Sequence, residues 1–163
     1  MSTELIDRLF DALSRRDAAA MASCYHPESR FSDPVFTDLR GEEVTAMWAM
    51  LCDRGEDLSV TWGDVSSNGD TGAARWEAHY SFGRDRRPVH NRIESAFVFA
   101  DGLILAHDDV FDLWRWTRMA LGPVGTFLGW SGPVKRRVRE QADAGLRRWM
   151  AGPVDPGGVD TEE

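Results

Sequence analysis

Cysteine is scarce in this sequence, with Cys24 and Cys52 the only two among 163 residues. Two thiols do not provide the spacing of a cysteine-based metal site, and a chain of this length buries a full hydrophobic core without disulfide bonds. We therefore expect one folded domain with no metal site. A reduced, cytoplasmic protein is the default expectation.

Long apolar runs and an excess of positive charge are also missing. No stretch approaches membrane-spanning length, and the N-terminal segment MSTELIDRLFDALSRRD is charged throughout, unlike a signal peptide. The formal net charge is −8. Because phosphate binding needs a cationic face, we expect no nucleic-acid partner.

The segment Val89–Trp116 carries the strongest structural signal that is present. It reads as two long strands joined at Ala100-Asp101-Gly102, since Asp-Gly is a strong hairpin signal. Alternation places the following residues on one face of the hairpin: Asn91, Ile93, Ser95, Phe97 and Phe99 on the first strand, and His107, Asp109 and Phe111 on the second. An aspartate among large apolar side chains is unusual in a core strand, and a sheet that curls around a pocket would explain it.

Three helices are predicted before the sheet. The first follows Ser2-Thr3, the second follows Asp17 and stops before Pro27, and the third runs from Glu42 to about Cys52. Between the second and third, Arg30–Phe36 is predicted as a short extended piece that Pro34 bends or confines to a sheet edge.

After residue 55 the sequence alternates between apolar and polar residues, as in a β-strand. Leu58, Val60 and Trp62 are the apolar residues of the first such strand. The next set is Trp76, Ala78, Tyr80 and Phe82, opposed by Arg75, Glu77, His79 and Ser81. With the hairpin, these patterns predict four meandering antiparallel strands. The fold class is therefore α+β, a strongly curved sheet wrapped around its helices.

The C-terminal region begins with an apolar segment, Leu121–Trp130, which glycine and proline interrupt and which we predict to be a loop. Pro133 then opens a helix with an apolar stripe: Val134, Val138, Ala142, Leu146 and Trp149. We expect both to pack over the open mouth of the sheet, in preference to a membrane-surface role for this basic helix. The expected organisation is a domain at 1–120, the packed loop and helix at 121–151, and a disordered tail at 152–163.

This order of elements resembles the NTF2-like superfamily, and in particular its SnoaL-like and ketosteroid-isomerase-like members. The resemblance rests on the early helices, the extended FSDPVF, and the closing FADGLI and HDDVFDLW, and it covers roughly Thr3 to Trp116. It implies a cone in which N-terminal helices pack inside a curved antiparallel sheet, here with an extra C-terminal helix. The superfamily holds isomerases, epoxide hydrolases, dehydratases, cyclases and inactive proteins, so it indicates a fold more than a function.

The resemblance places Asp33 at the position of the ketosteroid isomerase general base. A carboxylate in an apolar cavity has a raised pKa and can take a proton from a carbon beside a carbonyl. The positions of that family's oxyanion hole hold Leu9 and Ser95 here, so the resemblance does not extend to steroid isomerisation. The alternative for Asp33, within Ser-Asp-Pro, is a residue that only shapes a turn.

A second local resemblance involves Asp109. HDDVFDLW is similar to the limonene epoxide hydrolase strand on which an Asp helps to activate water. The Arg-x-Asp partner of that enzyme is similar in spelling to Arg75-Trp76-Glu77, but alternation points Trp76 inward and its neighbours outward. SnoaL-type cyclases use an Asp–His pair, and His107 shares a face with Asp109. The alternative for His107 is a hydrogen-bonded structural histidine.

The predicted site therefore has Asp33, Asp109 and His107 as catalytic residues. The predicted substrate-binding residues are Tyr25, Trp48, Trp76, Tyr80, Asn91, Ser95, Phe97 and Phe111. They suit a small apolar molecule and a cofactor-free isomerase, cyclase or hydrolase with an Asp general base. The alternatives are a non-catalytic binding or accessory protein and a dimeric interaction module. We expect no cofactor, and a homodimer formed through the outer face of the sheet.

Overall fold

The computed structural model describes residues 2–153. Its N-terminal part contains α1 (Ser2–Ser14), α2 (Ala18–Ala22), β1 (Tyr25–Ser32), β2 (Leu39–Arg40) and α3 (Glu42–Arg54). The strands β3 (Ser59–Ser67), β4 (Thr71–Phe82), β5 (Arg87–Ala100) and β6 (Leu103–Val110) follow. The chain then forms α4 (Leu113–Leu121), α5 (Pro123–Leu128) and α6 (Gly132–Ala151). The predicted α+β class is confirmed.

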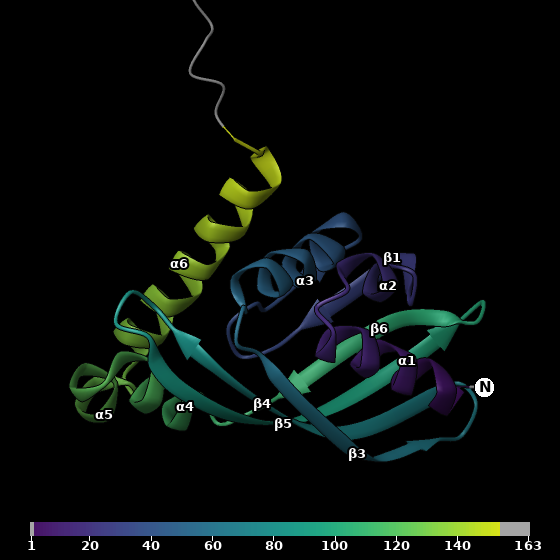
Figure 1. Cartoon of the computed structure of the whole chain (residues 1–163), viewed down its shortest axis with the longest axis horizontal. Helices are drawn as coiled ribbons and strands as arrows, with labels where there is room; N and C mark the ends of the chain where they lie inside the picture. The colour runs from purple at the N-terminus through teal and green to yellow at the C-terminus, as the bar shows by residue number, and fades with distance from the viewer. Residues whose placement is uncertain (1, 154–163) are drawn as a thin grey trace, which may run out of the picture.

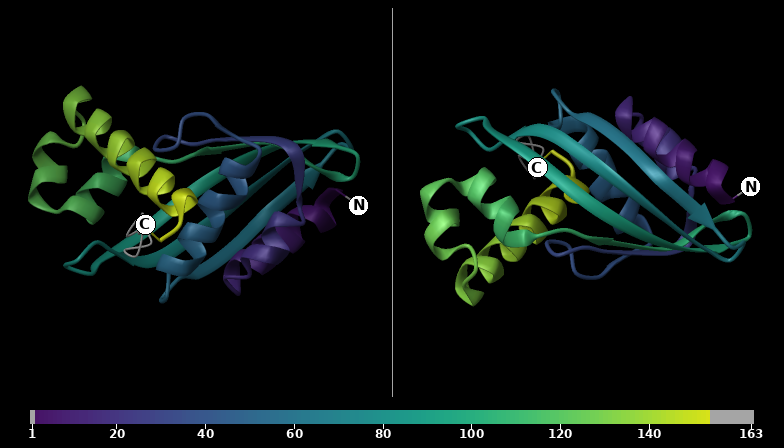
Figure 2. Two further views of the ribbon diagram at one scale, coloured as in Figure 1. Left: turned by 90° about the horizontal axis from the view of Figure 1, so that it is seen from above. Right: turned by 90° about the horizontal axis from the view of Figure 1, so that it is seen from below.

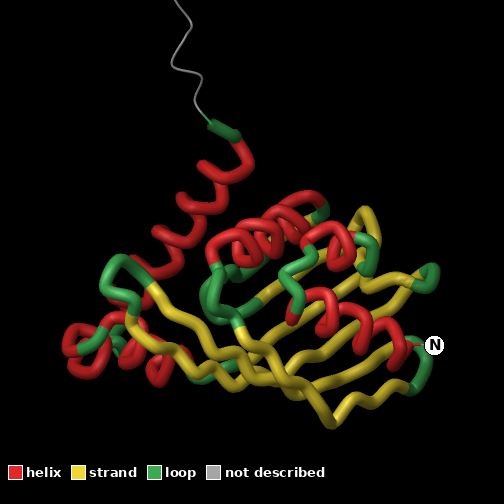
Figure 3. The backbone as a smooth tube through the Cα atoms, viewed as in Figure 1, coloured by secondary structure: helices red, strands yellow, loops and turns green. Residues whose placement is uncertain are grey.

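The strands form one sheet in the order β2-β1-β6-β5-β4-β3, and this sheet is strongly curved (Figures 1 and 3). Helices α1 and α3 lie on its concave side and close the cone (Figure 2). The apolar stripe of α1 supplies Ile6, Leu9 and Phe10, all essentially inaccessible to solvent. Because these side chains fill the narrow half of the cone, the core lies there and the wide half stays available for a site.

The hairpin expected at Asp101-Gly102 is present. Both residues have positive φ angles, 54° and 74°, as the two central residues of a type I′ turn require. The predicted alternation along β5 is also confirmed, with Asn91, Ile93 and Ser95 buried and the residues between them exposed.

Two predicted strand boundaries are wrong. The early strand runs over Tyr25–Ser32 and not Arg30–Phe36, because Asp33 turns the chain by accepting hydrogen bonds from two later backbone amides. The second hairpin strand ends at Val110, since the Asp112 side chain accepts from the Arg115 N–H and caps helix α4. In addition, β1 pairs in parallel with β6, so the sheet is not antiparallel throughout.

The C-terminal segment also departs from expectation. Leu121–Trp130 is mostly helical, with α5 in its middle, and Phe127, Leu128 and Trp130 are exposed instead of packed on the domain. Helix α6 does pack on the body, through the buried Val138 and Leu146. No described helix is long and apolar enough to cross a membrane. Most of the predicted disordered tail, residues 154–163, lies outside the described part.

Candidate active site

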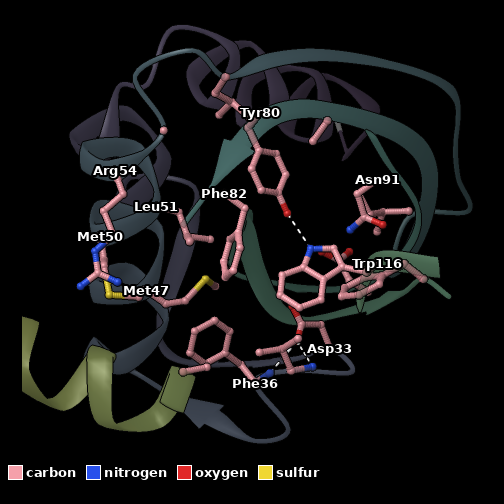
Figure 4. A pocket seen from close by; sticks show the side chains of 18 of the residues that line it. Asp33, Phe36, Met47, Met50, Leu51, Arg54, Tyr80, Phe82, Asn91 and Trp116 are labelled. Atoms are coloured by element: carbon pink, nitrogen blue, oxygen red, sulfur yellow. Dashed lines mark hydrogen bonds between the residues drawn. The ribbon is translucent and has the colours of Figure 1, made fainter. Parts of the chain in front are cut away.

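A cavity of about 590 Å³ occupies the wide half of the cone (Figure 4). Its walls come from the end of β1, from α3, from the inward faces of β4 and β5, from the end of β6, and from α4 and α6. Most of the lining residues are apolar. A few polar groups therefore face an apolar space, as in many sites for small molecules.

Asp33 stands where β1 ends, and its carboxylate is held by its own turn. Asp33 Oδ1 accepts hydrogen bonds from the backbone N–H groups of Val35 (2.7 Å) and Phe36 (2.6 Å). Within residues 2–153 both side-chain hydrogen bonds of Asp33 go to Oδ1, and the side chain lines the cavity. The turn-shaping alternative and a place in the cavity wall therefore hold together for this residue.

The pKa of Asp33 is raised from 3.8 to about 7. Burial is the main cause, because a poorly hydrated carboxylate is disfavoured, and the negative charge of Asp109 acts in the same direction. The amides of Phe36 and Val35 and the nearby His107 oppose the shift. At neutral pH the residue is thus poised between its acid and its carboxylate.

The parallel pairing of β1 with β6 brings the two aspartates together. Ser32 is the register partner of Asp108, so the next residues along the two strands, Asp33 and Asp109, reach the same end of the sheet. Both line the cavity. Periodicity within each strand could not reveal this juxtaposition, since it depends on which strands are neighbours.

Asp109 is the acceptor at the centre of a buried hydrogen-bond chain. Its Oδ1 accepts from His107 Nε2 (2.8 Å) and from the Ser95 hydroxyl. Ser95 Oγ in turn accepts from the Trp76 indole N–H (2.9 Å), and His107 Nδ1 meets the Tyr25 hydroxyl (2.8 Å). All five side chains are less than a tenth exposed. The chain therefore rigidly positions the Asp109 carboxylate.

The hydrogen-bond donors and acceptors on these five side chains determine which atoms carry the protons. The Trp76 N–H is only a donor, so the Ser95 hydroxyl gives its own proton to Asp109. His107 Nε2–H is also directed at Asp109, and the Tyr25 hydroxyl, with its own proton, lies against the other ring nitrogen, Nδ1. Burial, reinforced by the negative charge of Asp109, raises the pKa of Tyr25 well above its usual value and keeps that proton on the phenol.

Tyr80 and Trp116 form a second polar pair on the cavity wall. The Trp116 indole N–H donates to the Tyr80 hydroxyl oxygen (2.8 Å), as Figure 4 shows. This contact leaves the Tyr80 proton available to an acceptor in the cavity. Burial raises the pKa of Tyr80 to about 12, and the charge of Asp33 contributes, although the Trp116 hydrogen bond opposes it.

Most of the predicted site residues line the cavity: Asp33, Trp48, Trp76, Tyr80, Asn91, Asp109 and Phe111. Tyr25, Ser95, Phe97 and His107 do not. They are buried behind the wall, in the filled part of the cone, and do not face the cavity. Trp116 also lines the cavity but is not among the predicted site residues, because the sequence pattern places it at the end of the second hairpin strand.

Two family arrangements considered from the sequence are not formed. Arg75 is exposed and forms ion pairs with Glu94 (3.1 Å) and Asp64 (3.4 Å), so no arginine of that motif faces the cavity. Leu9, at the position of the isomerase tyrosine, is buried in the apolar core and offers no hydrogen-bond donor.

One group among the described residues has the composition of a metal site. The ligand atoms of Glu77, His79 and His90 lie within 4.8 Å of one another on the convex face of the sheet. The two histidines are opposite each other on β4 and β5, with ring centroids 3.9 Å apart. However, Arg92 Nε already lies 3.2 Å from Glu77 Oε1, and its charge would repel a cation. The group is also outside the cavity.

Comparison with known proteins gives one family and several similar structures. The family model described as a SnoaL-like domain matches residues 6–107. No curated protein matches the chain. The structure of TsrD from Streptomyces laurentii is 28% identical, with a TM-score of 0.63 over 73% of this chain and 92% of that one.

Two further structures are similar in fold. A putative SnoaL-like polyketide cyclase from Jannaschia sp. is 19% identical, with a TM-score of 0.65 over 74% of this chain and 91% of that one. An epoxide hydrolase of the LEH-like type from M. tuberculosis is 16% identical, with a TM-score of 0.62 over 78% and 95%. The expected cone of the NTF2-like superfamily is thereby confirmed.

Proposed function

We propose that this chain, which belongs to the SnoaL-like domain family, is a cofactor-free enzyme that moves a proton on a small hydrophobic molecule bearing a carbonyl or enol. The observation that carries the proposal is Asp33, whose pKa of about 7 is combined with an open position on the wall of an apolar cavity.

Asp33 would act first as a base and then as an acid. Its carboxylate takes a proton from the carbon next to the substrate carbonyl, which leaves an enolate. The protonated Asp33 then returns that proton to another carbon or to an oxygen of the same molecule, giving an isomer. A general base works best when its pKa is near the working pH, and a value of about 7 meets that condition.

Tyr80 is the proposed donor to the developing oxyanion. Its hydroxyl oxygen already accepts from Trp116, so its proton is directed elsewhere, and its pKa of about 12 keeps it protonated. Asn91, buried on β5, lines the same cavity and offers a second donor. Donors held in place before the reaction stabilise charge that appears in the transition state.

Asp109 has a positioning and electrostatic role in this proposal. Its contacts with His107 and Ser95 hold a carboxylate beside Asp33, and its negative charge contributes to the raised pKa there. A ring closure would use the same groups, since an enolate carbon formed by Asp33 can attack a second carbonyl of the substrate. The name of the polyketide cyclase with a similar fold is in keeping with this class of reaction.

The test is exchange of carbon-bound hydrogen for solvent deuterium. A panel of apolar ketones and β-diketones is first screened for binding by ligand-observed NMR, and deuterium incorporation beside the carbonyl is then followed by mass spectrometry. We expect the protein to accelerate exchange, and Asp33→Asn to lower the rate about 10²-fold or more. The matched control, Asp11→Asn, changes an exposed aspartate that pairs with Arg15 on α1 and does not line the cavity, and it should leave exchange unchanged.

Two results would contradict the proposal. Equal exchange by the Asp33→Asn variant would remove Asp33 as the proton carrier. Binding of panel members in the cavity without accelerated exchange by the unmodified protein would favour the non-catalytic binding protein considered from the sequence.

A further inference from the structure

Helix α5 has its apolar face directed away from the protein. Gly125 and Gly129 face α4, where a Cβ atom at either position would overlap the backbone or side chain of Thr117. The opposite face carries Val124, Phe127 and Leu128, and all three are exposed. A surface helix normally buries its apolar stripe, so this arrangement reverses the usual one.

The exposed apolar surface continues beyond α5 itself. Trp130 follows the helix and is 65% exposed, while Phe127 is 74% exposed. Trp114 on α4 is partly exposed and donates to the Thr126 carbonyl, which places it against α5. We call Trp114, Val124, Phe127, Leu128 and Trp130 the tip patch. Figures 1 and 2 show α5 at one end of the molecule, opposite the N-terminus, so nothing in the cone prevents it from meeting a flat surface.

The segment that carries the tip patch is basic. Residues 113–151 contain eight Arg or Lys and two Asp or Glu, a net charge of +6 in a chain whose total is −8. Lys135, Arg136 and Arg137 lie in the first turns of α6, which begins at Gly132, two residues after Trp130. No acidic residue of the described range pairs with them, in contrast to Arg75, for example.

We propose that the tip patch is a docking surface for an anionic lipid membrane. Bulky aromatic and aliphatic side chains that project from one end, with unpaired basic residues behind them, match the two components of a lipid interface: apolar acyl chains and negatively charged headgroups. The charge distribution favours an anionic membrane that contacts only this end of the protein. The rest of the chain has a formal net charge of −14 and would be repelled from the same surface. The membrane would therefore meet the protein tip first. This inference does not depend on the proposed enzymatic activity.

The structure changes the expectation drawn from the sequence. From the sequence, the apolar segment Leu121–Trp130 was expected to pack on the domain as a lid, in preference to a membrane-surface role. The glycine contacts with Thr117 instead hold the apolar side chains of α5 outward.

Co-sedimentation with lipid vesicles tests the proposal. Vesicles of phosphatidylcholine mixed with phosphatidylserine are compared with vesicles of phosphatidylcholine alone, at low and high salt. We expect binding to the anionic vesicles that weakens in high salt. The double variant Phe127→Ser, Trp130→Ser should bind at least about tenfold more weakly. Arg136→Gln should lose roughly fivefold, the effect of one basic residue near an anionic surface.

The matched control is Val110→Ser, which removes an equally exposed apolar side chain at the end of β6. Its vesicle binding should equal that of the unmodified protein, and circular dichroism checks that all variants are folded. Failure of the unmodified protein to bind anionic vesicles, or equal binding by the double variant, would overturn the proposal. Self-association that the double variant abolishes, without vesicle binding, would also overturn it and would assign the tip patch to a second copy of the chain.

Discussion

Replacement of Asp33 by Asn should stabilise the protein at neutral pH while it removes the proposed base. The Asn Oδ1 retains the hydrogen bonds from the Val35 and Phe36 amides, so the turn is preserved. What changes is the ability to carry charge. In the folded protein the pKa of Asp33 is about 7, compared with 3.8 for the ordinary group.

The sign follows from proton linkage. Between about pH 4 and pH 7 the folded protein keeps the Asp33 proton that the unfolded chain has released, so the free energy of unfolding falls as pH rises. The loss is about 1.4 kcal/mol per pH unit, at most about 4 kcal/mol in total, and solvent in the cavity reduces it. Asp33→Asn removes this cost. Its stability should match that of the unmodified protein near pH 4, exceed it increasingly up to about pH 7, and stay higher by a constant amount above that pH.

Urea unfolding at several pH values, followed by circular dichroism, measures the difference. Asp57→Asn is an informative control, because hydrogen bonds from Ser81 lower the pKa of Asp57. Its contribution to stability is present at neutral pH and is lost as pH falls, so this replacement should show the opposite dependence. Parallel pH profiles for the unmodified protein and Asp33→Asn would refute the raised pKa, and with it the main support for Asp33 as a base.

Three further predictions concern other parts of the molecule. Tyr80→Phe should reduce deuterium exchange about 10²-fold while ligand binding, measured by NMR, is retained, since it removes only the oxyanion donor. Gly125→Ala should destabilise by about 2 kcal/mol or more in urea unfolding, because its Cβ overlaps Thr117, whereas Gly132→Ala, with open space around it, should not. Light scattering at micromolar concentration should give twice the monomer mass if the convex face of the sheet forms the expected homodimer; a monomer mass would contradict it.

The parts of the fold that depend on local pattern could be predicted from the sequence. The turn at Asp101-Gly102 needs two residues that tolerate positive φ, and the alternation along β5 is a direct consequence of strand geometry. The end of the second hairpin strand could not be found in the same way. In HDDVFDLW the alternation continues to Phe111, and only the capping role of Asp112 reveals that a helix has begun.

The candidate site was only partly accessible to sequence reasoning, for a geometric reason. Alternation shows that a side chain faces the inside of the cone, but not how far along the axis it lies. His107 and Asp109 are on the same face, yet His107 is packed among the aromatic side chains of the narrow half and Asp109 reaches the cavity. The contribution of Trp116 depends on α4 packing against β5, which no local pattern indicates.

The cavity wall has a mixed origin. Its floor and the proposed base lie on the cone, whereas Trp116, Leu121, Val138 and Ala142 come from α4 and α6, beyond the family match at residues 6–107. The proposed catalytic carboxylate and the side chains that shape part of the cavity thus lie in different segments of the sequence. Exchange of the region after Asp112 between related chains would therefore reshape what the cavity admits while Asp33 stays in place, so ligand preference can diverge through the appended helices faster than the underlying chemistry.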